Sequence, residues 1–195
     1  MKTTVSALYD NATDAYATVR DLVDDGVSRS DVSLISNDAA GKYVEYHGKG
    51  IPADDTIGGA ASGAVIGGLG GLLVGLAALA IPGVGPIVAA GPIAAAFTGA
   101  GVGAVTGGFL GALVDLGVNE DEAHYYAEGV RRGGTLVTAH VEEGQANRVA
   151  DIMDRHDPVD LEGRVTFWRD QGWQSYNPEA DPYTAHEIER ERIHY

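Results

Sequence analysis

Cysteine is absent from this sequence of 195 residues, and lysine occurs only at Lys2, Lys42 and Lys49. Without cysteine, disulfides, thiol nucleophiles and thiolate metal sites are excluded. The 13 Lys and Arg residues face 28 Asp and Glu residues, which gives a net charge of −15. Binding to a phosphate backbone requires clustered cationic side chains. We therefore expect no nucleic-acid partner. No signal peptide is visible, so we expect the folded parts to be cytoplasmic.

Charge is also absent from a long internal segment, which runs from Thr56 to Val114. Its composition is dominated by small apolar residues, and it contains most of the 28 glycines of the chain. Charged residues return at Asp115. These changes in composition divide the chain into four predicted parts. They are a first α/β half with its linker at 1–55, an uncharged segment at 56–118, a second α/β half at 119–165, and a tail at 166–195.

The first part reads as strand, helix and strand. Apolar residues recur at helical spacing between positions 12 and 23, after a start signal at Asp10-Asn11 and before Gly26. β-branched and apolar residues precede this helix at 2–9 and follow it at 32–36. The sequence therefore predicts a βαβ unit.

The third part repeats this pattern. Asn119 is a helix N-cap candidate, and Gly133-Gly134 end the helix. A strand is predicted at 135–141, a helix at 143–156 and a last strand at 159–165. Because each half is too small to bury a core alone, we expect the two halves to pair. The predicted fold is α+β: a ferredoxin-like split βαβ sheet of four antiparallel strands with two helices on one face.

The tail is predicted to end in a charged helix with a capping box made by Thr184 and Glu187. Its aromatic residues Trp168, Trp173 and Tyr176 are candidates for packing on the open face of the sheet.

Glycine recurs every four residues in both arms of the uncharged segment. Residues four apart share one face of a helix, and a face without side chains allows close helix packing. We expect two helices, Thr56 to Ile81 and Pro92 to Val114, that are joined by a turn at 81–86 rich in proline and glycine. The predicted packing stripe comprises Gly59, Gly63, Gly67, Gly71, Gly75, Gly99, Gly103, Gly107 and Gly111.

Each arm is long enough to cross a bilayer, which takes about 20 apolar residues. The leading hypothesis is therefore a non-enzymatic protein whose glycine-zipper hairpin inserts in the cell membrane. Both termini would be cytoplasmic, and membrane lipid and other copies of the chain would be the partners. The acidic flanks and the lack of an aromatic belt favour the alternative. In that alternative, a cytoplasmic scaffold self-assembles and its hairpins bundle in an oligomer core.

Several stretches of the sequence resemble a known family. They are Thr3-Thr4-Val5, the turn from Ala80 to Pro86, the stretch from Ala89 to Pro92, and the stretch from Glu122 to Thr138, which reads EAHYYAEGVRRGGTLVT. On these residues the chain resembles the general stress protein 17M-like proteins, also called heat- or low-temperature-induced stress proteins. The resemblance covers about residues 1–160. It implies stress-linked expression, and it implies no catalytic residues.

The remaining motifs give no strong site. Residues 99–104 match the dinucleotide pattern GxGxxA, but they lie in a run of similar small residues and follow no predicted strand. The six histidines form no close ligand pair. Arg131-Arg132 falls in the last turn of a helix, where cations complement the helix dipole, and under the membrane hypothesis the pair is also a candidate for contact with lipid phosphate. The sequence thus predicts no catalytic residue, no metal ligand and no cofactor.

Overall fold

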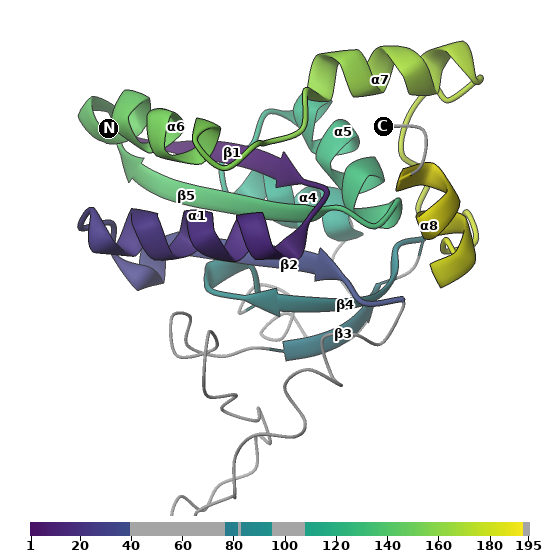
Figure 1. Cartoon of the computed structure of the whole chain (residues 1–195), viewed down its shortest axis with the longest axis horizontal. Coiled ribbons are helices and arrows are strands. Elements are labelled where there is room, and N and C mark those ends of the chain that lie inside the picture. The colour runs from purple at the N-terminus through teal and green to yellow at the C-terminus, as the bar shows by residue number, and fades with distance from the viewer. Residues whose placement is uncertain (40–76, 82, 95–107, 193–195) are drawn as a thin grey trace, which may run out of the picture.

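Five strands form one sheet in the order β1-β5-β2-β4-β3, and all neighbouring strands are antiparallel. The computed structural model describes residues 1–39, 77–81, 83–94 and 108–192 (Figure 1). The strands are β1 (Lys2–Tyr9), β2 (Val32–Asn37), β3 (Ala77–Ile81), β4 (Gly85–Ala90) and β5 (Thr135–Glu142). The chain is therefore a mixed α/β protein, and the predicted strands at 2–9, 32–36 and 135–141 are confirmed.

The strands from the two ends of the chain interlock. β5 lies between β1 and β2, with Tyr9 and Ser36 both opposite Thr135. The Ser36 and Thr135 hydroxyl oxygens lie 2.8 Å apart. Because β5 is antiparallel to both neighbours, β1 and β2 run parallel to each other. Neither half of the chain forms this part of the sheet alone.

Helices cover both faces of the sheet. Figure 1 shows α1 and α6 on one side, with α4 and α5 on the other. Alternate strand residues supply the two cores, since Tyr9 and Leu34 belong to the first cluster and Leu8 and Ile35 to the second. The helical segments are α1 (Ala12–Asp24), η1 (Arg29–Asp31), α4 (Gly108–Asp115), α5 (Glu120–Arg131), η3 (Glu143–Gln145), α6 (Ala146–Asp154), α7 (Leu161–Asp170) and α8 (Ala185–Arg192).

Helices α1 and α5 begin directly after the side-chain N-caps that the sequence predicts. The Asn11 side chain accepts a hydrogen bond from the Thr13 amide at 3.0 Å, and the Asn119 side chain accepts one from the Asp121 amide at 2.9 Å. Each bond satisfies an amide that has no partner within its helix.

The predicted strand at 159–165 is wrong. Residues from Leu161 onward form α7, which is capped by Asp160 through a 3.1 Å bond from the Gly163 amide. Its buried residues Val165 and Trp168 lie three apart, which is helical spacing. The four-stranded layout therefore lacks its fourth strand, and the β3–β4 hairpin extends the sheet at its other side.

The membrane-inserting hairpin is contradicted. Within the described ranges, no helix has the length and apolar character needed to cross a bilayer. Residues 77–81, which end the first predicted arm, form strand β3, and the reversal that follows joins β3 to β4. The end of the second arm forms α4, whose Phe109 and Leu113 are buried in the second core cluster.

Most of the predicted glycine stripe lies outside the described residues, namely the positions from Gly59 to Gly107. Gly111 is described and is half-buried in α4. The turns around the β3–β4 hairpin do require glycine. Gly91 has a φ of 80°, and a side chain there would collide with the Val32 carbonyl oxygen of β2.

Part of the tail packs on the second core. Tyr176 is buried, and its ring meets that of Phe109 edge-on at 6.4 Å between centroids. Burial raises the pKa of Tyr176 to about 12. The predicted capping box at the start of α8 is confirmed, because the Thr184 amide donates to Glu187 at 2.9 Å and the Glu187 amide donates to the Thr184 hydroxyl at 3.3 Å.

Candidate functional site

An arginine cluster lies where α5 ends, beside the carboxyl ends of β1 and β2. Arg131 is the last residue of α5, and Arg132 is its C-cap. Both side chains are largely buried, with 14% and 11% of their surface exposed. From the sequence, these cations were expected to complement the helix dipole or to contact lipid phosphate. The structure shows that they also have specific partners.

Glu128 holds the two arginines together. Its Oε1 accepts hydrogen bonds from Arg131 Nη1 at 3.1 Å and from Arg132 Nε at 2.6 Å. The Glu128 side chain is only 1% exposed. A buried carboxylate is costly unless it is paired, so removal of either arginine is expected to destabilise the domain.

Aromatic rings from the tail stack on the two guanidinium groups. The Arg131 guanidinium carbon lies 4.6 Å from the centre of the Tyr183 ring. The Arg132 carbon lies 4.9 Å from the centre of the Trp168 ring and 5.3 Å from that of Tyr183. These distances are typical of cation–π contacts. The pKa of Tyr183 is raised mainly by burial.

The chain's C-terminal region also supplies hydrogen-bond acceptors. The Asp181 backbone oxygen accepts from Arg131 Nη2 at 2.8 Å, and Glu191 Oε1 of α8 accepts from Arg132 Nη1 at 2.6 Å. Next to them, Ile188 of α8 packs against Gly133, where a side chain would collide with it. The tail therefore docks on the end of α5 through charged, aromatic and apolar contacts.

A further ion pair lies beside this cluster. Arg164 of α7 forms two parallel hydrogen bonds with Asp10, which follows β1, at 3.0 and 2.7 Å. The Arg164 side chain is 12% exposed, whereas that of Asp10 is 44% exposed. A two-pronged arginine–carboxylate contact fixes orientation as well as distance. It therefore anchors α7 to the end of β1.

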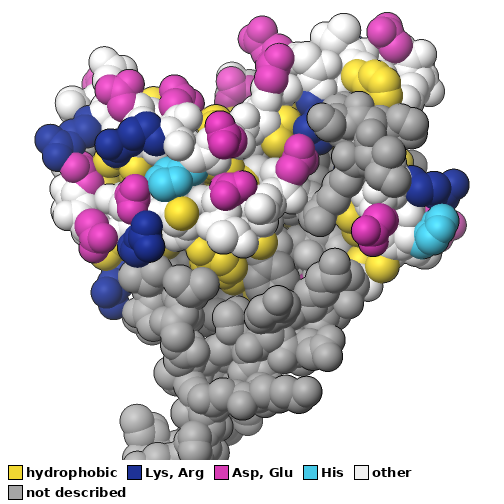
Figure 2. All heavy atoms as spheres, in the orientation of Figure 1, with side chains coloured by type: hydrophobic (Ala, Val, Ile, Leu, Met, Phe, Trp, Pro, Cys, Tyr) yellow, Lys and Arg dark blue, Asp and Glu magenta, His cyan; other side chains and the backbone are white. Residues whose placement is uncertain are grey.

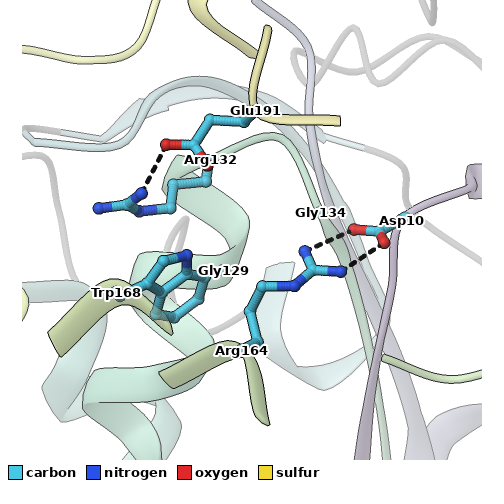
Figure 3. Close-up of a pocket in the computed structure, with 7 residues that line it drawn as sticks. All are labelled: Asp10, Gly129, Arg132, Gly134, Arg164, Trp168 and Glu191. Carbon is cyan, nitrogen blue, oxygen red and sulfur yellow. Dashed lines mark hydrogen bonds and ion pairs between the residues drawn. The ribbon is translucent and has the colours of Figure 1, made fainter. Parts of the chain in front are cut away.

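The Arg132–Glu191 and Arg164–Asp10 ion pairs border one small pocket, which Figure 3 shows with Trp168 between Arg132 and Arg164. The indole nitrogen of Trp168 is buried and has no hydrogen-bond partner among the described residues. A buried donor without a partner costs about 1–3 kcal/mol. The pocket is lined by Asp10, Gly129, Arg132, Gly134, Arg164, Trp168 and Glu191.

This site was hardly predictable from the sequence. Its residues come from the end of β1, from α5, from α7 and from α8, so no local motif contains them. The adjacent Arg131-Arg132 was the one visible signal. The predicted strand at 159–165 also concealed Arg164, because it placed this residue in the sheet.

A second feature of interest is the outer edge of β3. β4 is the only described neighbour of β3, with Ala77 opposite Ala89 and Ile81 opposite Gly85. Ala78 and Ala80 are exposed, and the strand has neither a charged residue nor a proline. Natural edge strands are commonly protected by such residues.

The face that carries α1 and α6 is different in character. Figure 2 shows acidic and basic side chains interspersed on it, without a large area of one sign. Arg148 of α6 forms an ion pair with Asp25 at the end of α1, and His156 Nε2, just after α6, lies 3.0 Å from a carboxylate oxygen of Asp21. The Arg148 guanidinium lowers the pKa of Asp25.

The described part of the chain contains no group of three or more acidic or histidine side chains able to hold a metal ion. Comparisons with protein-family models, with curated proteins and with solved structures find no match to this chain. Membership of the general stress protein 17M-like family therefore stays a prediction from the residues quoted above.

Proposed function

We propose that this chain is a non-catalytic, self-associating protein that functions as a scaffold, and that the outer edge of β3 is where two copies meet. The proposal rests on the composition and the exposure of this edge. It is apolar, uncharged and free of proline, and β4 is its only described neighbour. An edge of this kind offers backbone donors and acceptors to a second strand.

The sequence around β3 supports a second copy as the occupant of this edge. The uncharged segment from Thr56 to Val114 continues on both sides of β3. The chain carries a net charge of −15, so two copies repel each other except where charge is absent. Association through this segment brings the least charge into contact. Following the resemblance to the general stress proteins, we propose that the scaffold acts under stress.

A charge placed on the edge tests this proposal. Ala78→Lys introduces a cation on the exposed side of β3, as natural proteins do to keep edges apart. We expect the unmodified chain to form oligomers, and we expect Ala78→Lys to shift them to monomers. Light scattering coupled to size exclusion measures this. The matched control is Asn147→Lys on an exposed position of α6, which adds the same charge away from the edge. A monomeric parent chain, or equal dissociation by both variants, would contradict the proposal.

A further inference from the structure

We propose that Arg132 and the Trp168 indole N–H form a binding site for a carboxylate group, and that Glu191 of the chain's own tail occupies part of this site as an internal ligand. The inference is independent of the association at β3, because none of the residues that line the site belongs to β3 or β4. It concerns the small pocket in Figure 3.

The donors of the site are suited to a carboxylate. Arg132 presents Nη1, which Glu191 Oε1 already meets at 2.6 Å. Trp168 contributes a buried N–H without a described partner in the same pocket. Arginine forks match the planar geometry of carboxylates, and hydrogen bonds to a charged acceptor are stronger than neutral ones. A carboxylate that reached both groups would satisfy the donor that Glu191 leaves unused.

The charges of the cluster favour a ligand with a single negative charge. Arg131, Arg132 and Arg164 face Asp10, Glu128 and Glu191, so the described cluster is balanced. When Glu191 withdraws, one positive charge remains in excess. A carboxylate restores the balance, whereas a phosphate dianion exceeds it. The present occupant is itself a carboxylate, which agrees with this choice.

The internal ligand is held by a helix that depends on docking. α8 has eight residues, fewer than the roughly 12–15 that an isolated helix needs for stability in water. Ile188 is its only buried apolar anchor, while His186, Glu189 and Arg190 are exposed. An external carboxylate therefore competes with Glu191 of the short helix α8. The apparent affinity of the external carboxylate is its intrinsic affinity multiplied by the fraction of molecules in which Glu191 has left the site.

The competition can be measured on the full chain with acetate as the probe. The sequence has two tryptophans, so its NMR spectrum has two indole N–H signals, and Trp173→Phe assigns that of Trp168. In Glu191→Gln we expect acetate to shift the Trp168 signal saturably, with a midpoint about tenfold lower than in the parent chain. Sodium chloride at the same ionic strength should leave the signal in place.

Two further variants separate binding from a looser tail. Glu189→Gln removes the same charge from an exposed position of α8 and should behave like the parent. Arg164→Lys in the Glu191→Gln background keeps the charge but loses the two-pronged contact with Asp10 that anchors α7 and so positions Trp168, and it should weaken acetate binding several-fold. The proposal is overturned if acetate leaves the Trp168 signal of Glu191→Gln unchanged, if chloride shifts it equally, or if Glu189→Gln gains the same affinity.

The natural source of the carboxylate is either a small acid or an acidic peptide. A synthetic peptide with the sequence of residues 184–192 distinguishes them in the same assay, again with Glu191→Gln as the receptor. Binding at lower concentration than acetate identifies an acidic helix, including that of a second copy. Acetate binding without peptide binding identifies a small acid. Failure of both would leave the site without a ligand and would overturn the inference, while the test at β3 would stand unaffected.

Discussion

The two faces of the sheet differ in where their covering residues come from. The face beneath α1 and α6 is covered by charged, amphipathic helices that lie outside the uncharged segment, and polar side-chain contacts cross its surface. The other face is covered by α5 and by α4, which belongs to the uncharged segment. Both faces have fully buried cores. An uncharged apolar segment therefore predicts that its side chains are buried, but it does not reveal whether they are buried in protein or in lipid.

Burial in protein and burial in lipid are best distinguished at Leu113 of α4, where we expect the largest change in stability on substitution. This side chain is fully buried in the second core cluster. Leu113→Ala should lower the free energy of unfolding by about 2–5 kcal/mol, because it removes buried methyl groups and leaves a cavity. Chemical denaturation of the full chain measures the change.

The neighbouring Val114 supplies the control for this substitution, since it is 40% exposed in the same helix. Val114→Ala should change stability by less than about 0.5 kcal/mol. If Leu113→Ala has as little effect as the control, α4 is not part of the folded core and the comparison of the two faces fails.

A smaller effect is expected on the first face, at Tyr9. Its hydroxyl donates to the Met153 backbone oxygen of α6 at 3.1 Å. Tyr9→Phe should therefore destabilise the domain by about 1 kcal/mol at neutral pH, as measured by denaturation.

The same variant has a signature at high pH. Burial raises the pKa of Tyr9 from 10.0 to about 12. A raised folded-state pKa means that the contribution of the neutral hydroxyl is complete below pH 10 and is lost as the pH rises through 12. The deficit of Tyr9→Phe should shrink over this range. A deficit that stays constant would show that Tyr9 ionises equally in the folded and unfolded chain.

Much of the first face was predictable from the sequence. The helical spacing between positions 12 and 23, the Asn11 cap and the strands at 2–9 and 32–36 all agree with the structure. These signals work because each element has one polar and one apolar side, or a cap that has to be satisfied locally.

The second face was only partly predictable, because its elements lack that contrast. β4 is almost fully buried and uncharged, so it has no polar alternation to mark it as a strand. β3 is alanine-rich and apolar, which suits a helix as well as a strand. The arginine cluster was not predictable either, since pairing of Arg132 with Glu191 and of Arg164 with Asp10 depends on tertiary structure.

Native-state hydrogen exchange at β4 tests the central claim most directly, namely that the uncharged segment helps to build the sheet. β4 lies between β2 and β3, with Ala89 opposite both Ile35 and Ala77. We predict that backbone amides of β4 exchange about as slowly as those of β5, which also has a strand on each side, because both open only with the whole domain. Exchange of β4 amides on the timescale of an unstructured chain, while β5 stays protected, would contradict the account.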